Sequence, residues 1–344
     1  SGLRRMSPSD VEGTIERAAA RGCIVGVRAS LDDEDQDPWL LPPSRSPVIQ
    51  SIAGPLPDCV KMVRTNQIFI EKAGLPTAML NRLHRLAAFQ NPEFYRAQAM
   101  RFSTFGKPRI IHCAEEFPRH LALPRGSEEE AIQLLKAHGV AVVVEDRTVK
   151  GVKLDLKFHG ELRPEQSRAA KALAATGNGV LSATTAFGKT VIAAWLIARR
   201  NVNTLILVHR QQLLDQWRER LATFLKMPKK QIGKIGAGSK KATGEIDVAL
   251  MQSLNQRHTV DDLVAEYGHV IVDECHHVSA VSFEAIMRQV KARYVTGLTA
   301  TPVRKDGHHP VIFMQCGPIR YRVNAKAQAK LRPFNHWIVP RPTG

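Results

Sequence analysis

The sequence predicts an α/β protein: a parallel sheet with helices on both faces, preceded by a smaller α/β (α+β) domain. Two short apolar runs support this prediction. Residues 180–183 lead through a loop into a helix-like apolar run at 191–197, and residues 269–272 end in the acidic pair Asp273 and Glu274. Buried apolar strands that alternate with helices are typical of parallel sheets covered on both faces.

Length and composition predict the domain organisation. A chain of 344 residues favours about two domains. We expect an N-terminal segment and an acidic, proline-rich linker over 1–50, an accessory domain over 51–158, the larger domain over 159–325 and a basic linker over 326–344. The chain begins with Ser-Gly instead of Met, so we expect it to be part of a longer protein.

Helices and strands alternate in the predicted accessory domain. Helical spacing of apolar residues predicts a helix over 77–89, and Asn91 followed by Pro92 predicts the start of a second helix that runs to Met100. Further elements are predicted as strands over 109–113 and 121–126, a helix over 128–138 and a strand over 140–144.

A basic and aromatic segment lies within this domain. Arg101, Lys107 and Arg109 flank Phe102 and Phe105, and basic residues interleaved with aromatics suit a nucleic-acid strand. We therefore expect the three cations to contact DNA. The alternative, which the sequence leaves open, is that both phenylalanines are core residues and the charges form a solvated face.

A phosphate-binding loop is predicted at 183–190 (ATTAFGKT). It follows an apolar strand and opens a helix, whose first N–H groups favour a bound phosphate. Lys189 is expected to reach the outer phosphates and Thr190 to ligate Mg²⁺. The loop residues predicted to bind ATP are Thr185, Ala186, Phe187, Gly188, Lys189 and Thr190.

The acidic pair predicts the chemistry that accompanies a bound triphosphate. Asp273 and Glu274 follow a buried strand, at the end where open α/β sheets bind ligands. We expect Asp273 to hold Mg²⁺ through water and Glu274 to act as the general base toward the attacking water. Lys189, Asp273 and Glu274 are thus the predicted catalytic residues, and ATP and Mg²⁺ the predicted cofactors.

Several runs resemble those of superfamily-two DEAD/DEAH-type helicases, and especially their XPB-like branch. Besides the phosphate loop, they are LRPEQ at 162–166, LVHRQQLLDQW at 207–217, IDVALMQSL at 246–254, DECH at 273–276 and TATP at 299–302. The resemblance is tight over about 160–325. It implies an N-terminal accessory region followed by a first RecA-like domain.

The resemblance implies roles for further residues. Arg163 and Gln166 would take part in ATP binding, with the glutamine at the adenine edge, while Arg210 and Ser253 would touch the DNA backbone. One departure concerns Ala186, where the family usually has glycine. If this residue needs a left-handed backbone, alanine costs on the order of 1–2 kcal/mol, which we expect the loop to tolerate.

Coupling between ATP and movement is also implied by the resemblance. His276 would sense the bound nucleotide, with Thr299 and Thr301 as its partners. The alternative is a structural histidine, hydrogen-bonded in the core.

The family also implies a partner domain. Its members have a second RecA-like domain that supplies arginine fingers, and this sequence contains no matching QxxGRxxR run. An arginine finger is worth ~10³–10⁵ in turnover, so we expect this chain alone to bind ATP but to hydrolyse it slowly.

Charge predicts a nucleic-acid partner. The formal net charge is +17, which favours a polyanion, most simply DNA. No segment approaches ~18 continuous apolar residues, so we expect no membrane partner and a cytoplasmic location. The 5 cysteines form no Cys-x-x-Cys pair and are interpreted as reduced thiols.

Together these observations predict an ATP-dependent DNA helicase or translocase, with possible protein partners in a larger complex. Three alternatives stay open: a motor subunit of a DNA restriction or defence complex, an RNA helicase, and a DNA-binding module without enzymatic activity.

Overall fold

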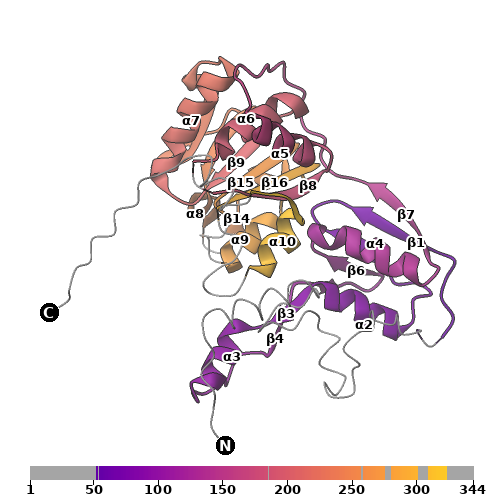
Figure 1. Cartoon of the computed structure of the whole chain (residues 1–344). Coiled ribbons are helices and arrows are strands. Elements are labelled where there is room, and N and C mark those ends of the chain that lie inside the picture. Colours follow the sequence, from indigo (N-terminus) through magenta and orange to yellow (C-terminus); the bar gives the residue numbers. More distant parts are fainter. Residues whose placement is uncertain are drawn as a thin grey trace, which may run out of the picture. The chain divides into compact units, whose positions relative to one another are not determined.

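The part of the chain that the structure describes is built around two main sheets (Figure 1). This structure is a computed structural model, and it describes residues 52, 54–184, 186–256, 259–275, 280–300 and 309–323. The predicted segments 1–50 and 326–344 lie outside these ranges.

The larger sheet has eight strands in the order β11-β10-β12-β9-β15-β16-β8-β17. All neighbouring strands are parallel except the hairpin of β10 and β11. The strands are β8 (Asn178–Ser182), β9 (Thr204–Val208), β10 (Ile232–Gly236), β11 (Ser239–Lys241), β12 (Ile246–Leu250), β15 (His269–Asp273), β16 (Tyr294–Thr299) and β17 (Ile319–Arg322).

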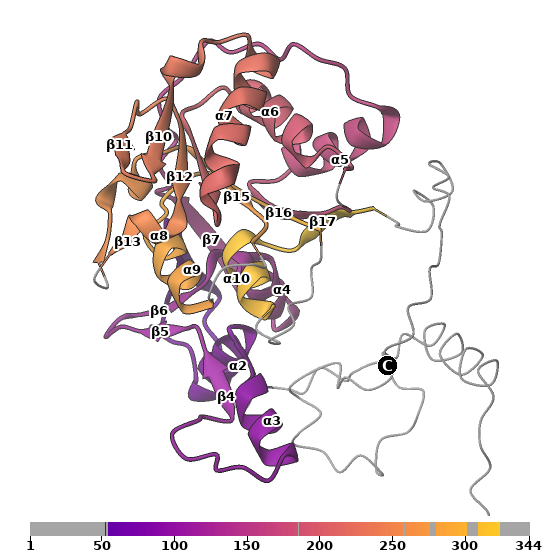
Figure 2. The same cartoon turned by 90° about the vertical axis from the view of Figure 1, so that its left-hand side faces the viewer.

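Helices cover both faces of this sheet, which Figure 2 shows from the side. Successive residues of a strand point to opposite faces. In β9, Ile206 and Val208 therefore pack with α5, α6 and α7, whereas Leu205 and Leu207 belong to the core that contains α8, α9 and α10. The predicted α/β fold is confirmed. The helices are α5 (Pro164–Ala174), α6 (Lys189–Arg200), α7 (Gln211–Leu225), α8 (Met251–Leu254), α9 (Ala280–Met287) and α10 (Pro310–Cys316).

The smaller sheet has five strands in the order β5-β6-β2-β1-β7. Only the pairing of β1 with β7 is parallel. Helices α2 (Thr77–Leu86) and α4 (Glu128–Ala137) bury Leu83 and Leu135 in its core. The strands are β1 (Cys59–Arg64), β2 (Ile68–Glu71), β5 (Glu115–Glu116), β6 (His120–Leu123) and β7 (Ala141–Asp146).

A short ribbon interrupts the smaller part of the fold. Strands β3 (Ala88–Gln90) and β4 (Ile110–His112) pair antiparallel, and between them run α3 (Pro92–Ala99) and an exposed loop at 100–109. Asn91 caps α3 as predicted, because its side chain accepts a hydrogen bond from the backbone of Glu93. The predicted helix 77–89 ends early, because residues 88–90 pair with β4 instead.

The remaining elements are short. The predicted strand 121–126 ends at Leu123, and the 3₁₀ helix η2 (Arg125–Ser127) follows it. The others are η3 (Lys229–Gln231), η4 (Asp262–Ala265), β13 (Asn255–Gln256) and β14 (Thr259–Val260). No helix within the described ranges is long and apolar enough to cross a membrane.

Candidate active site

Three neighbouring strand ends bring the predicted motifs together. Strands β15, β16 and β8 lie side by side, with Asp273 opposite Leu298 and Thr299 opposite Ser182. The N–H of Ala183 donates to the carbonyl of Thr299 at 2.9 Å. The phosphate loop, the acidic pair and the start of the 299–302 run therefore meet at one edge of the sheet, where open α/β sheets bind ligands.

Lys189 and Glu274 form an ion pair at this edge. The lysine Nζ and the glutamate Oε1 are 2.9 Å apart, and the side chains are only 10% and 18% exposed. Lys189 also donates to the carbonyl of Ala183 at 3.2 Å. Because Lys189 is the first residue of α6, its charge lies beside the N–H groups that lack intrahelical partners.

The loop before α6 has a left-handed backbone at two positions. Ala186 has φ 65° and Gly188 has φ 95°. The left-handed conformation costs an alanine about 1–2 kcal/mol, so the strain considered for Ala186 is present. A Cβ at Gly188 would lie 2.4 Å from Nε2 of Gln166, so a side chain at this position would require Gln166 to move.

Arg163 and Gln166 hold this loop through one carbonyl. The carbonyl oxygen of Phe187 accepts from the guanidinium of Arg163 at 2.6 Å and from Nε2 of Gln166 at 2.7 Å. Oε1 of Gln166 accepts from the N–H of Arg163 at 2.9 Å. Both residues at the start of α5 thus contact the phosphate loop directly.

Asp273 is a buried carboxylate held by an indole. It is 7% exposed, and its Oδ2 accepts from Nε1 of Trp217 in α7 at 2.7 Å. Burial raises the pKa of Asp273 to about 6, and the charge of Glu274 adds to the rise, while the bond from Trp217 and the charge of Lys189 act against it. A cation next to this carboxylate would stabilise its charged form.

Glu274 connects two of the strand ends. Its Oε2 accepts from the N–H of Ala300 at 3.3 Å, while Oε1 pairs with Lys189. The backbone of Glu274 is left-handed, with φ 48°, which turns the chain sharply after β15. The carboxylate is thus in contact with both the phosphate loop and the end of β16.

The donor set fits a magnesium nucleotide. The oxygens of Thr190 and Asp273 are of the kind that Mg²⁺ prefers, and the start of α6 with Lys189 suits phosphate. Thr190 is the second residue of α6, and Thr299 is fully buried at the end of β16. Thr185, His276 and Thr301 lie outside the described residues.

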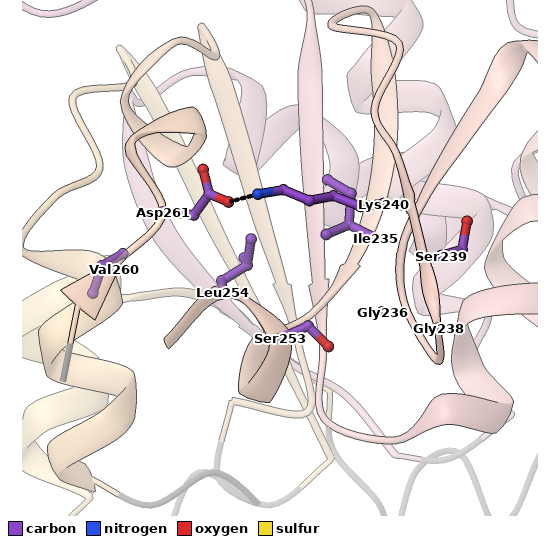
Figure 3. A pocket seen from close by; sticks show the side chains of 9 residues that line it. All are labelled: Ile235, Gly236, Gly238, Ser239, Lys240, Ser253, Leu254, Val260 and Asp261. Atoms are coloured by element: carbon purple, nitrogen blue, oxygen red, sulfur yellow. Dashed lines mark ion pairs between the residues drawn. The ribbon is translucent and has the colours of Figure 1, made fainter. Parts of the chain in front are cut away.

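The residues predicted to contact nucleic acid lie in two places. Arg210 follows β9 and Ser253 lies in α8 after β12, and these two strands are neighbours. Ser253 lines a cavity of about 410 Å³, where Lys240 forms an ion pair with Asp261 at 2.9 Å (Figure 3). Arg210 lines a second cavity, of about 730 Å³, together with residues 211, 212 and 215.

The other three predicted contacts lie in the loop at 100–109. Arg101, Lys107 and Arg109 are all exposed. Phe102 and Phe105 are 68% and 95% exposed, so the interpretation of these phenylalanines as core residues is wrong.

Trp217 is the site residue that sequence reasoning missed. It ends the 207–217 run and was not assigned a role, although it is 3% exposed. A buried indole N–H needs a hydrogen-bond partner. The sequence could therefore indicate that Trp217 has a hydrogen-bond partner, but only the fold shows that this partner is Asp273.

Parts of this chain are similar to known proteins. Residues 159–304 match the family model described as type III restriction enzyme, res subunit. A protein of Sulfurisphaera tokodaii named DNA 3'-5' translocase XPB2 is 32% identical over 189 residues, which make up 55% of this chain and 42% of that protein. A protein of Acanthamoeba polyphaga mimivirus, provisionally named ATP-dependent RNA helicase L396, is 29% identical over 169 residues, which make up 48% of this chain and 32% of that protein. The chain therefore spans less than half the length of either relative.

A solved structure shares the fold over a larger part of the chain. The crystal structure of the UvsW helicase from bacteriophage T4 superposes with a TM-score of 0.56 at 18% identity, and the match covers 76% of this chain and 98% of that one. Residues 159–304 are less than half of this chain, so the shared fold extends beyond them. Residues 159–304 thus match one family model, parts of the chain are similar in sequence to proteins named as a helicase and a translocase, and the UvsW structure shares the fold.

Proposed function

We propose that this chain is the first motor domain and accessory region of an ATP-dependent DNA helicase or translocase. The observation that carries the proposal is the meeting of Lys189, Asp273 and Glu274 at adjoining strand ends. Such a group of one cation and two carboxylates beside a helix N-terminus suits phosphoryl transfer from a nucleoside triphosphate.

Each residue has a chemical role in this proposal. The start of α6 and Lys189 would hold the phosphates, and Thr190 and Asp273 would hold Mg²⁺, which would supply positive charge to the phosphate oxygens. Glu274 orients the attacking water and accepts its proton. Its pairing with Lys189 suggests an order of events: once phosphates draw Lys189 away, the carboxylate of Glu274 is available as a base.

Coupling and movement require further parts. We propose that His276, Thr299 and Thr301 transmit the state of the nucleotide, and that a second RecA-like domain outside this chain supplies the arginine finger. The greater length of the relatives supports this second domain. Arg210, Ser253, Arg101, Lys107 and Arg109 would contact the DNA.

The choice of DNA follows the XPB-like motifs and the name of the Sulfurisphaera relative, whereas the mimivirus name points to RNA. Competition between duplex DNA and duplex RNA for the chain tests this choice. Preferential displacement by duplex RNA would favour the RNA helicase alternative.

The central test is ATP hydrolysis by this chain and by the full-length protein, each with and without duplex DNA. We expect DNA to stimulate ATP turnover in the full-length protein. In this chain, turnover should be lower by about 10³-fold or more, because the arginine finger is absent. Lys189→Ala and Glu274→Gln should abolish turnover, and Lys171→Ala, which changes an exposed lysine of α5, should not.

Three results would contradict the proposal. ATP turnover that DNA does not stimulate would contradict the interpretation of the protein as a DNA motor. Turnover that survives Glu274→Gln would remove the assigned general base. DNA binding without any turnover, and unchanged in Lys189→Ala, would favour a DNA-binding module without enzymatic activity.

A further inference from the structure

The loop at 100–109 exposes aromatic surface to an unusual degree. Phe105 is 95% exposed, Phe102 68% and the adjoining Met100 58%. Single exposed apolar residues are normal on protein surfaces, but three within six residues form a local patch. Such a patch marks a surface that contacts something else.

The loop is held at both ends, so its aromatic residues are presented from a defined base. Asn91 donates from Nδ2 to the carbonyl of Pro108, and its N–H donates to the carbonyl of Arg109, both at 2.8 Å. At the other end, the N–H of Phe102 bonds the carbonyl of Ala97 at 2.8 Å. Figure 2 shows the loop running from α3 back to β4.

The charge around the patch has one sign. Arg96, Arg101, Lys107 and Arg109 are exposed, and the sequence contains no Asp or Glu from 94 to 114. Within the described ranges, neither Arg101 nor Lys107 forms an ion pair. Arg109 lies over the ring of Phe94, 5.7 Å from its centroid. The cations are therefore available to a polyanion.

We propose that this loop binds unpaired nucleotides, with Phe105 and Phe102 stacked on bases and the cations on phosphates. In a duplex the faces of the bases are already stacked, so exposed phenylalanine rings gain contacts only where bases are unpaired. The DNA bound here would be a single strand or the open arm of a fork. This inference rests on the proposed function for the choice of nucleic acid.

Binding by the whole chain to forked, single-stranded and blunt duplex DNA tests the proposal. Phe105→Ala should weaken binding to forked and single-stranded DNA by about 5- to 150-fold, the range for loss of one base stack, and leave blunt duplex unaffected. Phe105→Trp should restore binding. Because Phe105 is 95% exposed, its substitution should not unfold the protein, which thermal unfolding would check.

Salt dependence separates stacking from phosphate contact. Phe105→Ala should leave the slope of log affinity against log salt unchanged, since no phosphate contact is lost. Lys107→Ala should make the slope less steep by about 0.7, as expected for the loss of one phosphate contact to a single strand. Val143→Ala is the matched control, because Val143 is 58% exposed on β7, away from this loop.

A direct readout is photo-crosslinking from 5-iodouracil placed in the unpaired arm, with the crosslinked peptide mapped to 100–109. Equal binding of forked DNA by wild type and Phe105→Ala would overturn the inference, as would equal losses for forked and blunt duplex DNA. Normal binding of forked DNA with loss of self-association would assign the loop to protein contact instead. If the wild type bound no DNA at all, the proposed function itself would fail.

Discussion

Trp217 illustrates how a residue can act on the reaction without touching the substrate. Its N–H holds Oδ2 of Asp273 at 2.7 Å, and this bond fixes the direction of a carboxylate assigned to Mg²⁺. Partners of metal ligands orient them, and their loss typically costs about 10–100-fold in metal affinity or activity. Trp217 is therefore a positioning residue.

Trp217→Phe should raise the Mg²⁺ concentration for half-maximal hydrolysis by about 10-fold, because the ring still fills the core but the hydrogen bond is lost. The measurement is the Mg²⁺ dependence of ATP hydrolysis by the full-length protein. Trp195→Phe in α6 is the matched control, since Trp195 packs in the same core and does not hydrogen-bond an acidic residue among those described. Equal Mg²⁺ dependence in all three proteins would contradict the assignment.

The buried charge of Asp273 should also cost stability when no cation is bound. Burial raises its pKa to about 6, above the value of about 3.9 in unfolded chains, so the folded state holds the proton more tightly between these values. Stability therefore falls as pH rises from about 4 to about 6. In EDTA at pH 8, Asp273→Asn should have a free energy of unfolding on the order of 2 kcal/mol higher than that of the wild type. The variant should therefore unfold at a higher denaturant concentration.

The stabilisation by Asp273→Asn should shrink as the pH falls below about 6 and vanish below about 4, where the aspartate is neutral in both states. Chemical unfolding across this pH range checks the prediction. A stabilisation that is independent of pH would show that the charge of Asp273 is not its cause.

At the scale of elements, the sequence predicted best where local pattern and tertiary context agree. The phosphate loop, β8, α6 and β15 follow from apolar runs and from Asp273, Gly188 and Lys189. Strands β1 and β2 were not predicted, because each is short and half-buried, and their outer partners, β7 for β1 and β6 for β2, are distant in sequence. The link between Trp217 and Asp273 likewise needs the fold, since no local pattern shows which residues meet across α7 and β15.

The phosphate loop offers a test at this scale. Gly188→Ala adds a Cβ that would lie 2.4 Å from Nε2 of Gln166, at a backbone with φ 95°. We expect the variant to lose ATP binding by at least about 10-fold, because Gln166 must release the carbonyl of Phe187. Equilibrium binding of a fluorescent ATP analogue measures the loss.

Gly139→Ala is the matched control for this substitution. Gly139 also has a left-handed backbone, with φ 80°, but no atom lies within 4 Å of the added Cβ. It should cost about 1–2 kcal/mol of stability from backbone strain and leave ATP binding unchanged. Equal effects on ATP binding would show that contact with Gln166 is not the cause.

At the scale of the whole molecule, the two sheets are joined by buried polar contacts as well as apolar ones. The guanidinium of Arg125, in η2, donates to the carbonyls of Thr65, Ala292 and Val290 at 2.8, 2.8 and 3.0 Å. A Cβ on the next residue, Gly126, would lie 1.9 Å from the carbonyl oxygen of Phe313. This close fit means that η2, which follows the last residues of β6, is packed directly against α10.

Arg125 should therefore contribute much to stability although its accepting partners are carbonyls and not carboxylates. It is 3% exposed, and burial lowers its pKa to about 10, so the charge persists at neutral pH. Lysine keeps that charge, but its single ammonium cannot donate to three carbonyls spread around a planar guanidinium. Arg125→Lys should lower the free energy of unfolding by about 2–4 kcal/mol, since buried carbonyls lose their donors.

Chemical unfolding of the whole chain measures this loss, and Arg147→Lys is the control. Arg147 forms only a surface ion pair with Glu145, and its side chain is 65% exposed, so that variant should stay within about 0.5 kcal/mol of wild type. If Arg125→Lys were as stable as Arg147→Lys, the three carbonyl bonds would not be what joins the sheets. The apolar core shared by α2, α4, α9 and α10 would then suffice for the joint.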